Sequence, residues 1–228
     1  MKKKTIIVLD TETLSINQTD KVEMHNNLPY QIGYAVVTPC DGATLLTRNY
    51  VIQETFFGMP ERMKSAYYAH KIPLYYEAIA KGEMKVEGFF KVMAELHRIV
   101  KEYDVCAICA HNARFDVDAL NTLCEVLSGY RCALPNVEIW DSMKMVKTFT
   151  ETKAYTKFCD ENKYKTGHRP PRNRMTAEII YRFISGDNDF VEEHTALEDV
   201  KIECEIIFKA YRTHKKMERV LYKKWEEK

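Results

Sequence analysis

The chain has 228 residues, of which 46% are hydrophobic and 29% are charged. These proportions are ordinary for a folded protein and exclude a wholly disordered chain. A chain of this length buries roughly 70% of its unfolded surface, so it needs no disulfide or structural metal to fold. Lys and Arg number 34 and Asp and Glu number 33, which gives a formal net charge of +1. A protein coated in positive charge is excluded, and any contact with nucleic acid must come from local patches.

The apolar runs, the N-terminal residues and the cysteines predict the cellular location of the protein. It has no run of about 18 apolar residues, which a membrane span requires. Met-Lys-Lys-Lys is followed by too few apolar residues for a signal peptide. We therefore expect a cytoplasmic protein without a membrane partner. Cys106 and Cys109 lie in V-C-A-I-C-A, which favours reduced cysteines in a buried strand. A zinc or redox site is the alternative for this pair.

The N-terminal region predicts an antiparallel meander. Residues 5–9, T-I-I-V-L, are β-branched and apolar and predict a buried strand. Residues 31–37 and 45–52 are further strand candidates, separated by the turn-forming residues P-C-D-G. Short turns of this kind join neighbouring antiparallel strands.

Helices and strands then alternate along the rest of the chain. The expected elements are a helical region over 59–103 that is clearest over 86–100, a strand over 105–110, a helix over 115–127 ending near Gly129, a strand over 137–140, and helices from 142 onward that break at 167–171 and 186–188. This order predicts a three-layer α/β fold with a mixed sheet. We expect one domain over residues 1–208 and an amphipathic basic helix over 209–228 that packs on it.

Two acids directly follow the first predicted strand. Asp10 and Glu12 stand two residues apart in V-L-D-T-E-T, so on a strand both side chains point to the same face. Buried side by side, their charges repel each other unless a cation lies between them. The end of a sheet strand is also where α/β proteins place their sites. The alternative is that Asp10 caps a turn and Glu12 is solvated.

Two later segments also place an acid after a histidine. The strand that follows the helical region runs into H-N-A-R-F-D, which ends at Asp116. Near the C-terminus, H-T-A-L-E-D places Thr195 and Glu198 at the spacing of a capping box before an apolar helix. If Glu198 turns back to the backbone, Asp199 is free to point elsewhere. His194 then falls just outside the helix, and an ordinary loop histidine is the alternative for it.

In this order, D-x-E, H-N-x-x-F-D and H-x-x-x-x-D resemble the motifs of the DEDDh family of 3′–5′ exonucleases. That family includes the epsilon proofreading subunit of bacterial replicative polymerases, ribonuclease T, oligoribonuclease and phage exonucleases. The resemblance covers about residues 5–210, and three motifs in order are far more specific than one. It implies a ribonuclease H-like α/β/α fold with a mixed central sheet, and it makes residues 1–208 an exonuclease domain.

The resemblance also implies roles for the motif residues. Asp10, Glu12, Asp116 and Asp199 match the four carboxylates that bind two divalent metal ions, and His194 matches the general base. Mg²⁺ and Mn²⁺ prefer oxygen ligands, which suits four acids. Two such ions polarise a scissile phosphate and ready a water molecule. A neutral histidine can accept the proton of that water near neutral pH.

Neighbours of these acids match positions that line the substrate in the family: Thr11, Thr13, Leu14, His111, Asn112 and Phe115. Core packing is the alternative for Phe115. Asp118 is expected to be solvated, and Asp141 is expected to cap a helix rather than bind metal.

Basic residues gather in two further segments. Residues 163–174 hold five Lys or Arg and no acid. We interpret Lys165, Arg169 and Arg172 as contacts to phosphates, with a solvated loop as the alternative. Residues 209–228 carry eight Lys or Arg and three Glu among apolar residues. A role in binding a partner or nucleic acid stays open for that segment.

The sequence therefore predicts a metal-dependent 3′–5′ exonuclease that releases nucleoside 5′-monophosphates from single-stranded or frayed 3′ ends. DNA is the favoured substrate, because the third motif most resembles those of polymerase-associated and phage members. A polymerase or replication protein is the partner that this resemblance suggests. An RNA-processing exoribonuclease is the alternative within the family. A catalytically silent domain that binds nucleic acid or a polymerase is the alternative outside it.

Overall fold

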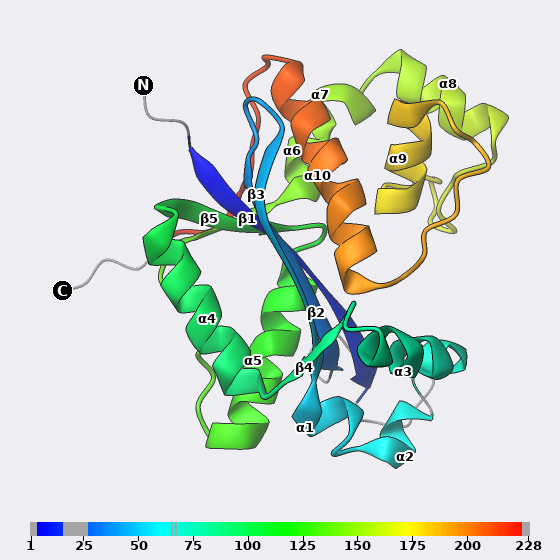
Figure 1. The fold of residues 1–228 in the computed structure, drawn as a ribbon. Coiled ribbons are helices and arrows are strands. Elements are labelled where there is room, and N and C mark those ends of the chain that lie inside the picture. The colour runs from blue at the N-terminus through cyan, green and yellow to red at the C-terminus, as the bar shows by residue number, and fades with distance from the viewer. Residues whose placement is uncertain (1–3, 16–26, 65, 67, 225–228) are drawn as a thin grey trace.

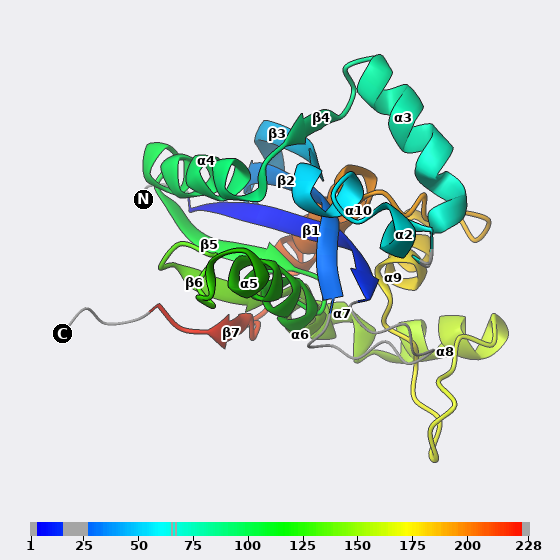
Figure 2. The ribbon, with the colours of Figure 1, turned by 90° about the horizontal axis from the view of Figure 1, so that it is seen from below.

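A seven-stranded mixed sheet forms the centre of the computed structural model, which describes residues 4–15, 27–64, 66 and 68–224 (Figures 1 and 2). The strands lie in the order β4-β3-β2-β1-β5-β6-β7. β1 pairs antiparallel with β2 and parallel with β5, so the sheet is mixed. The strands are β1 Thr5–Ser15, β2 Asn27–Thr38, β3 Ala43–Ile52, β4 Lys85–Glu87, β5 Val105–Ala110, β6 Glu138–Asp141 and β7 Val220–Tyr222.

Helices cover both faces of this sheet (Figure 1). Ile7 and Leu9 of β1 belong to the core on the face of α4 and α5, whereas Ile6 and Val8 belong to the core on the face of α10. Successive strand residues point to opposite faces, so one apolar strand supplies both cores. The helices are α1 Gln53–Phe56, α2 Pro60–Met63, the 3₁₀ turn η1 Ala69–Lys71, α3 Ile72–Ala80, α4 Phe89–Glu102, α5 Arg114–Ser128, α6 Ser142–Met145, α7 Lys147–Thr150, α8 Lys153–Glu161, α9 Ala177–Ser185 and α10 Ala196–Arg212.

The strand predictions are confirmed for the meander and for the buried strand at residues 105–110. β4 is a difference, because it lies inside the region predicted to be helical and pairs parallel with β3. A strand of three residues is too short to show a periodicity of its own. The helix α5 ends as predicted, with Gly129 following it in a left-handed conformation at φ 78°.

Asp141 confirms its predicted capping role. Its carboxylate accepts a hydrogen bond from the backbone N–H of Met143, 2.9 Å away, at the start of α6. It also accepts one from the backbone N–H of Asn112, at 3.1 Å, which ties the end of β6 to the loop after β5.

The C-terminal segment differs from the prediction. The helix α10 ends at Arg212, and Val220–Tyr222 forms β7, which pairs antiparallel with β6. The helix predicted over 209–228 is therefore wrong for residues 213–224. β-Branched and aromatic side chains at β7 favour a strand there, and the alternating charges masked that preference. Residues 225–228 lie outside the described part of the chain.

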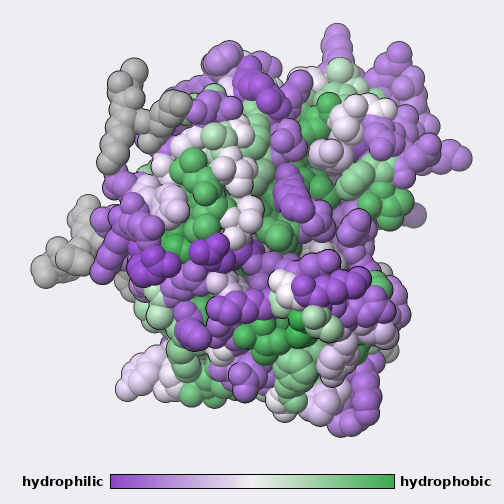
Figure 3. All heavy atoms as spheres, viewed as in Figure 1, coloured by the Kyte–Doolittle hydropathy of each residue, from purple (hydrophilic) through white to green (hydrophobic). Residues whose placement is uncertain are grey.

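The surface seen in Figure 3 is largely hydrophilic with smaller hydrophobic patches between. Among the described residues, no helix is both long enough and apolar enough to cross a membrane. All seven cysteines are free, with Cys109 buried on β5 and Cys106 half-buried beside it.

Candidate active site

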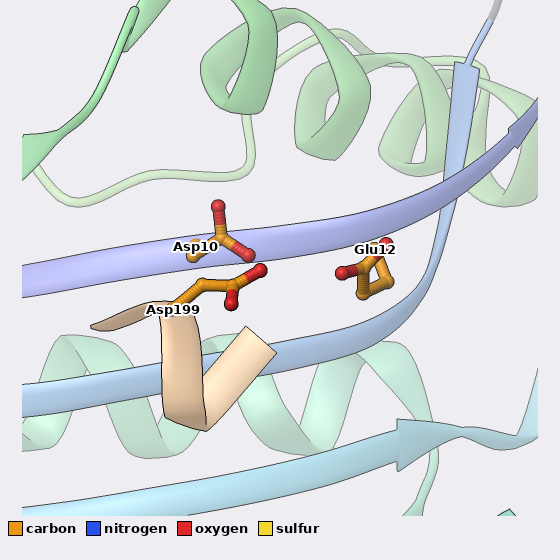
Figure 4. A group of neighbouring side chains, drawn as sticks. All are labelled: Asp10, Glu12 and Asp199. Atoms are coloured by element: carbon orange, nitrogen blue, oxygen red, sulfur yellow. The ribbon is translucent and has the colours of Figure 1, made fainter. Parts of the chain in front are cut away.

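Three of the four motif acids meet beside the middle of β1, which continues to Ser15 and does not end before Asp10 as predicted. One carboxylate oxygen from each of Asp10, Glu12 and Asp199 lies within 4.8 Å of the others. Figure 4 shows the Asp10 and Asp199 carboxylates facing each other, with Glu12 further along β1. The predicted placement of Asp10 and Glu12 on the same face of the strand is therefore confirmed.

A glycine lets α10 bring Asp199 to β1. Gly33 on β2 pairs directly with Asp10. A Cβ atom built on Gly33 would lie 2.5 Å from the backbone of Ala196 and Leu197, which no real contact tolerates. The start of α10 therefore rests on the bare backbone of β2, and Asp199 follows within the same first turn of the helix.

The N-terminus of α10 is capped differently from the prediction. Thr195 occupies the N-cap position but makes no side-chain capping bond. Glu198 pairs instead with Lys201, 2.5 Å away, so the capping box is wrong. The side chain of Gln31, fully buried on β2, accepts a hydrogen bond from the Ala196 N–H at 3.2 Å. A residue from another strand thus supplies the hydrogen bond to the start of α10 that the capping box was predicted to supply.

The fourth acid, Asp116, approaches from α5. Its Oδ1 accepts hydrogen bonds from the backbone N–H and the hydroxyl of Thr11, at 3.1 and 2.8 Å. Asp116 is 4% exposed, and these two bonds fix its carboxylate near Asp10 but outside the group of three acids. Thr11, which was predicted to contact a nucleotide, is itself buried, and it donates both hydrogen bonds to Asp116.

Burial and mutual repulsion make these carboxyl groups hard to ionise. Burial followed by the charge of Asp199 raises the pKa of Glu12 to about 9. Burial followed by Glu192 raises the pKa of Asp199 to about 8. Burial raises the pKa of Asp116 to about 7, and burial with the charge of Asp116 raises that of Asp10. Positive charge in their midst would remove this cost.

Asp10 and Asp199, but not Glu12 or Asp116, line a cleft of about 560 Å³. The cleft is also lined by Glu203, Arg174 and Asn112. Glu203 was not singled out from the sequence. It lies one turn after Asp199 on α10, where helical spacing places both side chains on the same buried face, and that spacing was the available signal.

The residues present fit a divalent cation. Oδ1 of Asp199 and Oε2 of Glu203 are buried and have no hydrogen-bond partner among the described residues. Buried polar atoms are nearly always paired, so two unpaired carboxylate oxygens beside other acids mark a place for a ligand. Oxygen donors of this kind suit Mg²⁺ and Mn²⁺. The acidic group that could hold a metal among the described residues contains no cysteine.

His194 lies beside the acids but faces a neighbouring cavity of about 1030 Å³. Its ring stacks on Tyr68, with centroids 4.6 Å apart and planes 18° from parallel. The residue adopts a left-handed conformation, with φ 50°, at the end of the loop that precedes α10. The carboxylate of Glu192, which lines both the cavity and the cleft, is 3.6 Å from Nδ1.

Lys71 holds the loop that carries His194. Its ammonium group donates hydrogen bonds to the backbone carbonyl groups of Glu193 and, at 3.4 Å, of His194. The same group lies 5.0 Å from the centre of the Tyr68 ring. Burial, followed by the positive charge of Lys71, lowers the pKa of His194. Neither Tyr68 nor Lys71 carries a signal in the sequence, because they meet this loop only in the folded chain.

The second motif uses two of its residues to shape the loop after β5. The ring of His111 is held at 2.7 Å by both Ser142 Oγ and the carbonyl oxygen of Met175, and it lines the cleft. Asn112 is exposed at φ 63°, a conformation that asparagine tolerates better than most residues. Phe115 is half-buried in the first turn of α5.

A bulge in β1 separates Leu14 from the acids. The pairing of β1 with β2 shifts register between Glu12 and Thr13. Leu14 is consequently 1% exposed in the core with Ile7 and Leu9, on the other face of the sheet. Thr13 is half-buried at the bulge. The structure does not bring Leu14 to the cleft.

The basic segment forms a protruding hairpin after α8, seen in yellow-green in Figure 2. Lys165 is engaged within it, 2.7 Å from Asp160 and bonded to Asn173. Arg169 and Arg172 are exposed. Arg174, which was not singled out from the sequence, is the hairpin arginine that lines the carboxylate cleft.

Comparisons with known proteins support the fold. The sequence matches no protein-family model and no curated protein. Among solved structures, the chain is similar to a full-length 3′-exonuclease, with a TM-score of 0.58 and 10% identity over 96% of this chain and 86% of that one. It is also similar to a 3′-exonuclease that recognises the 3′ end of a histone mRNA stem-loop, with a TM-score of 0.56 and 10% identity over 92% and 82%. The predicted ribonuclease H-like α/β fold is confirmed by this likeness.

Proposed function

We propose that this chain is a metal-dependent 3′–5′ exonuclease of the DEDDh family. The observation that carries the proposal is the meeting of Asp10, Glu12 and Asp199 within 4.8 Å, in a fold similar to that of 3′-exonucleases. Asp116 completes the four acids from α5. All five motif residues are present, which argues against a catalytically silent domain.

The four acids are the residues that would hold two divalent ions, Mg²⁺ or Mn²⁺. When bound, such ions polarise the scissile phosphate and lower the pKa of a water molecule. Thr11 keeps Asp116 near Asp10 through its two hydrogen bonds. The raised pKa values of the acids express how strongly this site favours positive charge.

His194 acts as the general base in this proposal. From its position on Tyr68, the ring has to turn toward the cleft to take the proton of the attacking water. Its place in the loop before α10, outside the regular helix, allows that movement. The lowered pKa keeps the imidazole neutral at pH 7 and therefore able to accept a proton.

The cleft and the hairpin provide contacts for the nucleic acid. Asn112 and Arg174 line the cleft beside Asp10 and Asp199. A contact of Phe115 with the substrate stays a prediction of the sequence. Arg169 and Arg172 on the hairpin are free to meet phosphates further along the strand, a contact that does not depend on sequence. Lys165 contributes less, because Asp160 already neutralises it.

Single-stranded or frayed DNA is the substrate we favour, with nucleoside 5′-monophosphates as products. RNA is the second candidate, because one structural neighbour recognises the 3′ end of a histone mRNA stem-loop. A polymerase partner and a cytoplasmic location remain predictions of the sequence.

The test is the substitution Asp199→Asn, which keeps the size of the side chain and removes its charge. We expect nuclease activity to be lost, because a proposed metal ligand loses its charge. We expect the fold to be retained, because the substitution removes a buried charge whose Oδ1 has no hydrogen-bond partner among the described residues. The matched control is Glu205→Gln on the same helix, where the side chain is exposed and pairs with Arg212, 3.8 Å away. An Asp199→Asn variant that keeps wild-type activity would contradict the assignment of the site.

A further inference from the structure

A fifth acid, Glu203, lies in the wall of the carboxylate cleft. It follows Asp199 by one turn of α10, which places both side chains on the same face of the helix. Glu203 is 3% exposed and lines the cleft together with Asp10 and Asp199. Glutamate is almost never buried this deeply unless it has a partner.

Only half of the Glu203 carboxylate has such a partner. Oε1 accepts a hydrogen bond of 3.2 Å from the backbone N–H of His111. Oε2 is buried and has no hydrogen-bond partner among the described residues. One oxygen of Glu203 therefore holds the loop after β5, and the other, in a residue that lines the cleft, is left without a hydrogen-bond partner in the described part of the chain.

The charged groups around Glu203 are themselves acids. Burial, followed by the charges of Asp116, Asp199 and Glu192, raises the pKa of Glu203. Burial raises the pKa of Asp10, and the charges of Asp116 and then Glu203 raise it further. Another acid at this place increases a repulsion that is already large, and only a bound cation turns that repulsion into attraction.

The acids whose oxygens lie within 4.8 Å of one another are Asp10, Glu12 and Asp199, and Glu203 lies outside that group. We propose that a bound cation draws Glu203 into the divalent-metal centre, where it becomes a fifth carboxylate ligand through Oε2. The bound ion would be a hard divalent cation, Mg²⁺ or Mn²⁺, because every donor atom is a carboxylate oxygen. This inference rests on the proposed function, since it adds a ligand to the centre proposed there.

If Glu203 has a purely structural role and serves only to accept the His111 N–H, metal binding should not depend on its charge. Glu203→Gln separates the two roles, because glutamine keeps an oxygen that can accept this bond and loses the charge. Glu205→Gln is the matched control, since Glu205 lies two residues away on the exposed side of α10.

The experiment measures two quantities for the full-length wild type and both variants. The first is Mn²⁺ affinity by calorimetric titration, and the second is the melting temperature in EDTA. For Glu203→Gln we expect Mn²⁺ to bind at least about tenfold more weakly, the scale on which metal-site support residues act. We expect its metal-free melting temperature to stay the same or rise, because a buried unpaired charge is removed. Glu205→Gln should match the wild type in both.

The outcomes separate this inference from the proposed function. If Glu203→Gln binds Mn²⁺ as the wild type does, Glu203 is not a ligand, although the proposed function stands. If the metal-free variant is less stable or does not fold, Glu203 serves the fold and the inference is overturned. If the wild type itself binds no Mn²⁺, the metal centre and the proposed function fail together.

Discussion

His194 is held apart from the acids by two side chains that come from a different part of the chain. Tyr68 stacks on its ring, and Lys71 binds the backbone on which it is mounted. These contacts set its charge as well as its position, because burial and Lys71 both disfavour the imidazolium form. A base that is neutral in its resting position can accept a proton as soon as it reaches the water.

We expect His194→Ala to lower the rate by about 10²–10⁴-fold, the usual contribution of a general base. In the wild type the rate should rise with pH as the imidazole loses its proton, with a midpoint below the ordinary value of about 6.5 because the pKa is lowered. The measurement is the pH–rate profile of both proteins with the same metal, accompanied by Mn²⁺ affinity.

Mn²⁺ affinity should survive the His194→Ala substitution, because no ligand is removed. His214→Ala, beyond the far end of α10, is the control and should leave the profile unchanged. A His194→Ala variant with near-normal rates and the same acidic limb would show that the histidine is a bystander.

Single residues were predictable where a local rule places them. The shared face of Asp10 and Glu12 follows from the alternation of a strand, whereas Asp116 and Asp199 were assigned by the resemblance of their motifs to the exonuclease family. Of these two, Asp199 joins Asp10 and Glu12 within 4.8 Å. Leu14 was misplaced because a bulge in β1 reverses its direction, and neither its position nor its neighbours in sequence reveal the bulge. Glu203 was missed although it occupies a core position of an otherwise apolar helix face.

At the scale of elements, the contact between β2 and α10 positions the site. Gly33 gives the helix a bare strand to rest on, and Gln31 on the same strand caps the helix end. The sequence predicted both elements but not their contact. The capping box failed because a buried partner from another strand took over its function, and such a partner is visible only in three dimensions.

We expect Gly33→Ala to destabilise the protein and slow the reaction. The new methyl group would lie 2.5 Å from the backbone of Ala196 and Leu197, so α10 must shift. Overpacking of this kind costs about 1–3 kcal/mol, and a displacement of roughly 1 Å at a reacting group can cost about 10²-fold in rate. Urea unfolding and the turnover rate are the two measurements.

Gly167→Ala is the control for unfolding, because a Cβ atom at Gly167 meets nothing within 4 Å. It should leave the free energy of unfolding unchanged. If Gly33→Ala has the stability and rate of the wild type, close packing of α10 on β2 does not position Asp199.

For the molecule as a whole, the clustered acids link stability to pH and to metal. The pKa values of Asp116, Asp199 and Glu12 are raised from 3.8, 3.8 and 4.5 to about 7, 8 and 9. The folded state therefore binds more protons than the unfolded state in this range. The stability that these protonated acids contribute is complete below about pH 4, and it is lost as pH rises through their pKa values in the folded state.

We expect the melting temperature in EDTA to fall as pH rises from about 4 toward about 8, because the unfolded acids are ionised over this range while the folded acids keep their protons. The decline should level off once the folded acids ionise as well. Saturating Mn²⁺ should flatten this decline, and Asp199→Asn should flatten it without metal. A metal-free melting temperature that is constant over this range would contradict the account of the cluster.

Most of the architecture was predictable because apolar strands and amphipathic helices carry clear periodic patterns. The C-terminal segment was not, because its alternating charges suggested a helix while its three-residue strand depends on an open edge of β6. That edge exists only once the sheet has formed.

The measurement that tests the central claim most directly follows single strands labelled at either end. DNA and RNA strands of the same sequence, labelled at the 5′ or the 3′ end, are incubated with Mg²⁺, Mn²⁺ or EDTA. We expect the 3′ label to leave at once as a mononucleotide and the 5′-labelled strand to shorten stepwise, with DNA degraded faster than RNA and no reaction in EDTA. Faster loss of RNA would assign the second substrate. Release of the 5′ label first, internal cuts, undiminished activity in EDTA, or no cleavage under any condition would contradict a metal-dependent 3′–5′ exonuclease.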